Sequence, residues 1–464
     1  MRSARIPVFG VLLAIKSALL LADPTTRLYL GDSAAYLYGA MDNGRLPDDR
    51  SFTYSLVLRA LVRPFDNLAV LPWWQGLAGA LIAYLLFQLL TRSFGVPRPW
   101  AFGAACLLAL EPAQLYYERM VLAETFGLLA FVLFFAAAAA YLASRRLFWL
   151  PVAAALALVA VSFRLNYLPI ALVISLALPL LGRLRLSHVA VAVVAVVACH
   201  SAYCVWVGHI FRAPPGYLGR AGFMQLGLVL PLVTSEHLTR VGLPPDLEQY
   251  LSFPLSDPHA RMAHLWQPGG LIRELRRRGV DVEQVARPLS RMAVLDHPLG
   301  VVRLGLFTIA DYFRSDVAQH AIDDDLGRRV IPPEILWSLR EDWGYDATDL
   351  HARDTLISRY FAAGTWWYVG CFFALPVIAV LNVFAQWRTA YRAQALLAGL
   401  FGLGLVAAHI LFVPVALYRY FHPLAFFVLL TAVPLLVRNA RPSQSAIILD
   451  SGGCTRLPSG PETR

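Results

Sequence analysis

The chain has 464 residues, of which 58% are hydrophobic and 15% are charged. A water-soluble core cannot bury so large an apolar fraction, which excludes an ordinary soluble protein and predicts an all-α polytopic membrane protein. The 40 basic and 30 acidic residues give a net charge of +10. Because these charges lie in short clusters between apolar spans, they indicate membrane orientation and phosphate contacts, with membrane lipids as partners and no nucleic acid.

Ten apolar runs are long enough to be predicted as transmembrane helices. They lie at residues 7–23, 67–91, 100–116, 120–143, 147–163, 167–182, 188–210, 363–387, 393–414 and 418–437. The first run is expected to be an uncleaved signal anchor, because Lys16 interrupts it and no Ala-x-Ala cleavage site follows Leu21.

Paired arginines assign the sides of the membrane through the positive-inside rule. The pairs are Arg2 and Arg5, Arg92 and Arg98, Arg145 and Arg146, Arg183 and Arg185, Arg388 and Arg392, and Arg438 and Arg441. They fall in alternate short loops or at the chain ends, so both termini are expected in the cytoplasm. The remaining loops then lie on the outer, periplasmic face of a bacterial inner membrane.

This topology divides the chain into four parts. We expect an N-terminal transmembrane module at 1–210 with a first outer loop at 24–65, a mainly helical outer-face domain at 211–362, C-terminal transmembrane helices at 363–440, and a disordered cytoplasmic tail at 441–464. The outer-face domain is assigned from its shift toward Arg, Asp, Pro and Gly. The first outer loop has room for one or two short helices lying on the membrane.

Two stretches of the outer-face domain have an interpretation of their own. Residues 299–313 predict an amphipathic helix that is too short to span and therefore lies on the membrane surface, with Arg303 and Asp311 off its apolar face. That face follows a spacing of three and four residues and consists of Leu299, Val302, Leu306, Ile309 and Phe313. The acidic run 323–325 is interpreted as solvated loop charge, because consecutive carboxylates rarely converge on one metal ion.

Asp32 is the first candidate for chemistry, because it places a carboxylate just beyond the first apolar span. The tyrosines around it, Tyr29, Tyr36 and Tyr38, suit the level of the lipid headgroups. Partial loss of water there is expected to raise the pKa of the carboxyl and to suit it as a general base. The alternative is that Asp32 or Ser33 caps a short interfacial helix.

Two glutamates follow in the next outer loop. Glu124 precedes a full apolar span, so it should lie at the outer headgroup boundary, where an ionisable group is costly and often functional. Glu118 is a second candidate, and the alternative for both is stabilisation of a helix N-terminus. Their spacing of six residues does not place them on one helix face, so they are expected to have different partners.

Two arginines lie on the same outer face, where the positive-inside rule disfavours them. Arg164 precedes Asn-Tyr-Leu-Pro, and Arg419 opens the last span with His422 one helical turn further on. A guanidinium fork is suited to hold a phosphate oxygen, whereas the alternative is an arginine that reaches to lipid headgroups. His422 is interpreted as a hydrogen-bonded structural residue.

The pattern resembles the GT-C superfamily of integral-membrane glycosyltransferases, which contains protein O-mannosyltransferases and lipid A aminoarabinose transferases. The matching stretches are Gly31-Asp32-Ser33, Glu118 to Glu124, Arg164 before Asn-Tyr-Leu-Pro, and Tyr418-Arg419-Tyr420 with Pro423. Together they cover the order of features over most of the chain. The sequence shows no P-loop, HExxH or CxxC motif.

The resemblance implies transfer of a sugar from a polyprenyl-phosphate donor to a lipid, glycan or protein acceptor of the cell envelope. Asp32 would be the catalytic base, and Arg164 or Arg419 would stabilise the departing phosphate. Glu124, or Glu118 as the alternative match, would orient the acceptor or hold a divalent cation such as Mg²⁺ or Mn²⁺. No nucleotide cofactor is needed, because the lipid phosphate is the leaving group.

Two other classes of function stay open. A polysaccharide polymerase or ligase would place its chemistry on His259, His264 or Arg291 of the outer-face domain. A lipid or solute transporter would favour ionisable groups at mid-membrane depth, as Lys16 is expected to be.

Overall fold

The computed structural model describes residues 7–182, 184–220, 222–251 and 269–440. Within these ranges the regular structure is helical, which confirms the prediction of an all-α protein. An isolated parallel bridge joins Arg27 to Met120. The expected disordered tail at 441–464 and the arginines at positions 2, 5, 183 and 441 lie outside the described residues.

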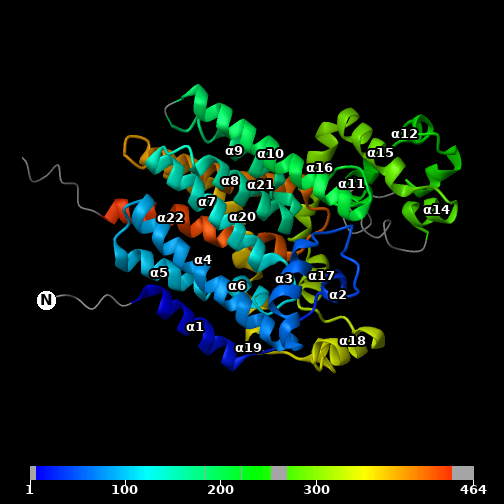
Figure 1. Cartoon of the computed structure of the whole chain (residues 1–464), viewed down its shortest axis with the longest axis horizontal. Helices are drawn as coiled ribbons and strands as arrows, with labels where there is room; N and C mark the ends of the chain where they lie inside the picture. Colours follow the sequence, from blue (N-terminus) through cyan, green and yellow to red (C-terminus); the bar gives the residue numbers. More distant parts are fainter. Residues whose placement is uncertain (1–6, 183, 221, 252–268, 441–464) are drawn as a thin grey trace, which may run out of the picture.

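Each of the ten apolar runs contains helix, and these helices form a bundle. Its members are α1 (Val8–Ala22), α4 (Leu71–Ser93), α5 (Arg98–Ala109) with α6 (Pro112–Tyr117), α7 (Glu124–Ser144), α8 (Trp149–Phe163), α9 (Leu168–Ala177), α10 (Leu186–Phe211), α20 (Thr365–Gln386), α21 (Arg392–Phe412) and α22 (Leu424–Ala440). Figure 1 shows them side by side, with the start of α1 and the end of α22 at the same end of the molecule.

Six of these helices, in the part of the chain described, are long and apolar enough to cross a membrane. They are the ones within Leu68–Ser93, Glu124–Ser144, Leu186–Phe211, Thr365–Gln386, Arg392–Phe412 and Tyr418–Arg438. The protein is therefore a multi-pass membrane protein, but the structure supports fewer full-length spans than the ten predicted. The runs at 7–23, 100–116, 147–163 and 167–182 are themselves shorter than 18 residues and form helices shorter than 18 residues, and the run at 100–116 is further divided between α5 and α6.

Proline sets where several of these helices begin. Pro72, Pro99, Pro112 and Pro169 occupy the first turn of α4, α5, α6 and α9, where the missing N–H costs nothing. The core of the bundle is aromatic: Phe131 stacks on Tyr167 with ring centroids 4.3 Å apart. In contrast, many apolar side chains of α10 remain exposed, as expected of a helix that faces lipid.

The first loop forms two short helices, α2 (Ser33–Ala40) and α3 (Thr53–Leu61), as expected. Residues 211–362 are called the loop domain below, and their described part is mainly helical. Buried side chains within 223–247 and 271–293 form a small hydrophobic core of their own, whereas buried side chains within 309–361 join the core of the bundle. The helices of the separate core are α11 (Gly222–Val229), α12 (Ser235–Arg240), α14 (Leu271–Arg277) and α15 (Val282–Asp296). Figure 1 shows these four together at the end of the bundle opposite the start of α1.

The remaining loop-domain helices bring this part of the chain back to the bundle. They are α16 (Pro298–Asp311), α17 (Ser315–Asp325), α18 (Pro333–Trp343) and α19 (Leu356–Ala363). Helix α16 confirms the predicted helix over 299–313, and α15 and α16 meet at 96°.

The packing of α16 differs in part from the expectation. It contacts α21 so closely that a Cβ at Gly305 would lie 1.8 Å from the carbonyl oxygen of Ile410. Leu299, Val302, Leu306 and Phe313 stay exposed as an apolar face, but Ile309 is buried. Asp311, expected to be off that face, is also buried, and it pairs with Arg314 at 3.3 Å.

Candidate active site

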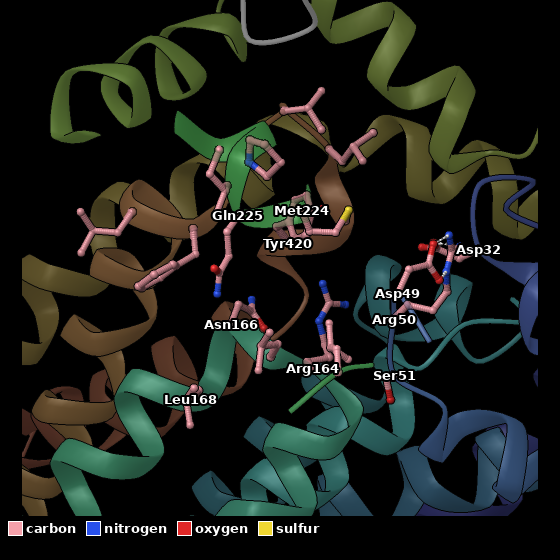
Figure 2. A pocket seen from close by; sticks show the side chains of 18 of the residues that line it. Asp32, Asp49, Arg50, Ser51, Arg164, Asn166, Leu168, Met224, Gln225 and Tyr420 are labelled. Carbon is pink, nitrogen blue, oxygen red and sulfur yellow. Dashed lines mark hydrogen bonds and ion pairs between the residues drawn. The ribbon is translucent and has the colours of Figure 1, made fainter. Parts of the chain in front are cut away.

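A cavity of about 1720 Å³ lies between the bundle and the loop domain. Four of the five predicted site residues line it, namely Asp32, Glu124, Arg164 and Arg419. Figure 2 shows Asp32, Arg50 and Arg164 around this cavity, with Tyr420 and the loop-domain residues Met224 and Gln225. The fold therefore brings together polar groups that are up to 387 positions apart in the sequence.

Asp32 occupies the position just before α2, but its side chain does not cap that helix. Its Oδ1 accepts a hydrogen bond from Arg50 Nη1 and its Oδ2 accepts one from Arg419 Nη1, both at 2.6 Å. The carboxylate is 23% exposed, so a small molecule in the cavity has access to it. The capping alternative does not describe this side chain.

The pKa of Asp32 corrects the expectation from sequence. Burial alone would raise the pKa of this carboxyl, but the charges of Arg419 and Arg50 outweigh burial and lower the pKa below its ordinary value. The sequence argument considered only loss of water, since it could not show that two guanidinium groups hold the carboxylate. In this state Asp32 is ionised at neutral pH.

Arg50 is a site residue that the sequence analysis missed. It pairs with Asp49 through two hydrogen bonds of 2.9 Å, and it also donates to the carbonyl of Gly31 and to Asp32. An arginine in a predicted outer loop runs against the positive-inside rule. The same argument singled out Arg164 and Arg419, and it could have singled out Arg50 from the sequence as well.

Glu124 and Arg164 form a second ion pair beside the first. Glu124 is the first residue of α7 and Arg164 directly follows α8, and their side chains are 4% and 12% exposed. The guanidinium of Arg164 lies 5.4 Å from the centre of the Tyr420 ring, and that of Arg419 lies 5.3 Å from the same ring. Tyr420 thus connects the two ion pairs through cation–π contacts.

Hydrogen bonds of the backbone and of Ser33 fix the loop before α2 against the loop before α7. Arg27 donates its N–H to the carbonyl of Arg119 at 2.7 Å, and Val121 donates to the carbonyl of Arg27 at 2.9 Å. The hydroxyl of Ser33 donates to the carbonyl of Val121 at 2.8 Å. Because the bond between Ser33 and Val121 lies one residue from Asp32 and three from Glu124, it helps to hold both carboxylates at the cavity.

Glu118 does not line the cavity. It forms an ion pair with Lys16 at 2.7 Å, with side chains 0% and 1% exposed, and accepts a hydrogen bond from Gln114 at 2.8 Å. The two glutamates thus have different partners, as their spacing indicated. His422 is buried and pairs with the amide oxygen of Gln114 at 2.9 Å, which matches its interpretation as a structural residue.

The loop domain contributes further charges to the cavity wall. Arg287, Arg291, Arg329 and Asp324 line it, whereas His259 and His264 lie outside the described residues. The acidic run 323–325 differs from the prediction of solvated loop charges, because it ends helix α17 and its members point to different partners. Asp323 pairs with Arg328, Asp324 pairs with Arg329, and Asp325 is buried.

The residues of this site do not fit a divalent cation. Among the described residues no group of three or more His, Cys, Asp and Glu side chains could hold a metal ion. Asp32 lies between two guanidinium groups and Glu124 is paired with a third, so both carboxylates already have cationic partners. The fixed positive charge that a metal would supply is already provided by arginine.

The other part of the cavity is apolar. Its lining includes Leu168, Pro169, Leu228, Val294, Leu295, Leu411 and Phe412, from α9, α11, α15 and α21. An apolar wall beside three guanidinium groups matches a ligand with an anionic head and a hydrocarbon tail.

The chain matches no protein-family model, no curated protein and no solved structure. The case for a function therefore depends on the site itself. The arrangement offers a carboxylate that can accept a proton, guanidinium groups that can bind a phosphate, and space for two reactants.

Proposed function

We propose that this protein is a membrane glycosyltransferase that moves a sugar from a polyprenyl-phosphate donor to a hydroxyl group of an acceptor. The observation that carries the proposal is the carboxylate of Asp32 held between Arg50 and Arg419 in a cavity that also has an apolar wall. The donor phosphate would lie against the arginines, and its lipid tail along Leu168, Leu411 and Phe412.

Binding of the donor would change the partners of Asp32. In the structure both oxygens of this carboxylate accept hydrogen bonds from arginine, which keeps its pKa low and its basicity weak. A phosphate that takes Arg419 and Arg164 as partners would leave Asp32 with Arg50 alone. The pKa of Asp32 would then rise, so the base becomes stronger when the donor is bound.

The transfer step uses these groups in an inverting displacement. Asp32 accepts the proton of the acceptor hydroxyl while that oxygen forms a bond to the anomeric carbon. The bond between the anomeric carbon and the phosphate oxygen breaks, and its electron pair leaves with the polyprenyl phosphate. Arg164 and Arg419 stabilise the charge that develops on this leaving group, and Glu124 orients Arg164. No step requires a metal ion.

The same proposal includes a GT-C-like topology of ten helices in the inner membrane, with both termini in the cytoplasm and the cavity on the periplasmic face. It is supported by helix within all ten apolar runs and by the position of the start of α1 and the end of α22 at one end of the bundle. The cavity and the loop domain lie toward the other end.

Transfer of radiolabelled sugar from polyprenyl-phosphate donors in membranes that contain the protein tests the reaction. Wild type should yield labelled product, and Asp32→Asn should lower the rate by about 10² to 10⁴, the usual contribution of a general base. Asp42→Asn is the matched control, because Asp42 lies in the same loop with its side chain 75% exposed and does not line the cavity.

Near-normal transfer by Asp32→Asn would contradict the assigned role. A rate that tolerates this change but is lost on replacement of Arg291 would favour a polymerase or ligase. Movement of substrate across sealed vesicles without a new glycosidic bond would favour a transporter.

A further inference from the structure

The backbone that carries Arg419 is held by two side chains of the loop domain. The hydroxyl of Tyr312 accepts a hydrogen bond from Leu417 N at 3.0 Å and donates to the carbonyl of Leu417 at 2.9 Å. The carboxylate oxygen Oδ2 of Asp325 accepts hydrogen bonds from Tyr418 N at 2.7 Å and from Arg419 N at 3.2 Å. The main chain at 417–419 is therefore fixed from outside its own helix.

The hydrogen bonds from Asp325 satisfy backbone N–H groups at the start of a short helix. The short helix η7 (Tyr418–Phe421) leaves its first N–H groups without partners inside the helix. Tyr418 is buried, so water cannot replace those partners. Asp325 comes from the last turn of α17, its side chain is fully buried, and it takes the role that a capping residue normally has.

The guanidinium of Arg419 is held by a hydrogen bond to Asp32 and lies over the rings of Tyr29 and Tyr420. Its Nη1 reaches Asp32 at 2.6 Å and its charged end lies 4.2 Å from the centre of the Tyr29 ring. Its Nε is buried and has no hydrogen-bond partner among the described residues. The orientation of this side chain therefore depends on where its own backbone is held.

We propose that Asp325 is a positioning residue for Arg419, and that its carboxylate sets how tightly the cavity binds a lipid phosphate. This inference rests on the proposed function for the ligand, but the contact between Asp325 and the backbone can be tested separately. An ionised carboxylate accepts these hydrogen bonds more strongly than a neutral one does. The backbone at Tyr418 and Arg419 is thus held best when Asp325 is ionised.

The surroundings of Asp325 place its titration near neutral pH. Burial raises the pKa of Asp325 to about 7, although the charge of Arg419 and the two backbone N–H groups act to lower it. Its other oxygen, Oδ1, is buried and accepts no hydrogen bond within the described part of the chain. The titratable and charged groups that act on or face this carboxyl are Arg419, Glu124, Tyr29, Tyr116, Tyr117, Tyr312, Tyr368 and Tyr418.

The first experiment needs no ligand. Hydrogen exchange of the backbone amides of residues 418 and 419, followed by mass spectrometry at one pH above 7, measures the protection that Asp325 provides. We expect Asp325→Asn to speed this exchange by about tenfold, since a neutral acceptor replaces a charged one. Asp323→Asn is the matched control, because Asp323 makes its contacts with Arg328 and Gln319. Equal exchange in wild type and Asp325→Asn would overturn the inference.

The second experiment measures binding of undecaprenyl phosphate to the detergent-solubilised protein on both sides of pH 7. Wild type should bind more tightly as the pH rises through about 7. Asp325→Asn should keep only the pH dependence of the phosphate itself, and above pH 7 should bind about tenfold more weakly. Tyr312→Phe removes the other contact to this backbone, so it should weaken binding without changing the pH dependence of binding. This variant tests the inference even if Asp325→Asn does not fold.

The outcomes separate the two proposals. If wild type binds undecaprenyl phosphate and Arg419→Gln weakens that binding, while Asp325→Asn behaves as wild type, the role of Asp325 is wrong and the proposed function stands. If wild type does not bind this lipid, the proposed function and the effect on the ligand fail together. Hydrogen exchange then still decides whether Asp325 holds the backbone.

Discussion

The molecule places two glutamate ion pairs close together in sequence and in very different surroundings. Glu118 pairs with Lys16 inside the bundle, where both side chains are sealed from solvent. Glu124 pairs with Arg164 at the wall of the cavity and lies beside Asp32 and its two arginines. The sequence criterion that an ionisable group at the membrane boundary is often functional selected both glutamates. Only Glu124 can meet a ligand.

The difference teaches that charge at a membrane boundary does not by itself identify a site. The pair of Lys16 and Glu118 is balanced, one charge against one, and is closed by close packing: a Cβ at Gly79 would lie 1.8 Å from the Glu118 carboxylate. The cavity cluster is open, and Asp32 alone contacts two guanidinium groups. The lining of the whole cavity has seven arginines and five acidic residues, so its net charge is positive, as an anionic ligand requires.

The largest effect on stability is expected inside the bundle. Glu118→Gln should lower stability by about 3 to 5 kcal/mol, because it leaves the ammonium of Lys16 buried without a counter-charge. The thermal midpoint of the detergent-solubilised protein measures this loss. Adding Lys16→Met should restore most of it, since removing both charges is far less costly than removing one. A double variant as unstable as the single one would contradict this account of the pair.

The same substitution at the cavity should cost less. Glu124→Gln keeps a hydrogen-bond acceptor for Arg164, whose guanidinium also faces the cavity and the Tyr420 ring, so we expect a loss of about 1 to 3 kcal/mol. Transfer activity per folded molecule should fall, in contrast to Glu118→Gln rescued by Lys16→Met, which should remain active. If both glutamate variants behaved alike in stability and in activity, the contrast between the two regions would be wrong.

The smallest effect concerns pH. Asp32 has a lowered pKa because Arg419 and Arg50 outweigh its burial, so Arg50→Gln should raise that pKa. The base is then protonated over a wider range, and the acid limb of kcat/KM should move to higher pH. Arg45→Gln is the control, because Arg45 is exposed in the same loop and does not line the cavity. An acid limb that does not move would mean that another group controls it.

The general class of fold was predictable because hydropathy reports it directly. The number of full-length spans was not, because an apolar run of the right length can contain a helix that ends early. The run at 100–116 shows the reason: Pro112 starts a new helix after Ala109, with Glu111 capping it through a hydrogen bond of 2.6 Å. A hydropathy average over a window of residues does not detect such a break in the helix.

Four of the five predicted residues line the cavity, and each was singled out because it violates a local expectation, such as an arginine in a predicted outer loop or an acid before a span. Arg50 was missed although it violates the same expectation as Arg164. Asp325 gave no local signal, because its role follows from hydrogen bonds to a backbone 93 and 94 residues away. The proximity of Asp32 to Glu124 likewise depends on the bridge between Arg27 and Met120, which a single sequence does not reveal.

The sealed position of Lys16 has a practical consequence for labelling chemistry. Lys16 is the single lysine among 464 residues, and its ammonium is buried against Glu118. Amine-directed reagents therefore find no accessible lysine side chain in the folded bundle, and they gain one when α1 separates from its neighbours. The rate at which residue 16 is modified therefore measures how often the transmembrane bundle opens, without any substitution in the chain.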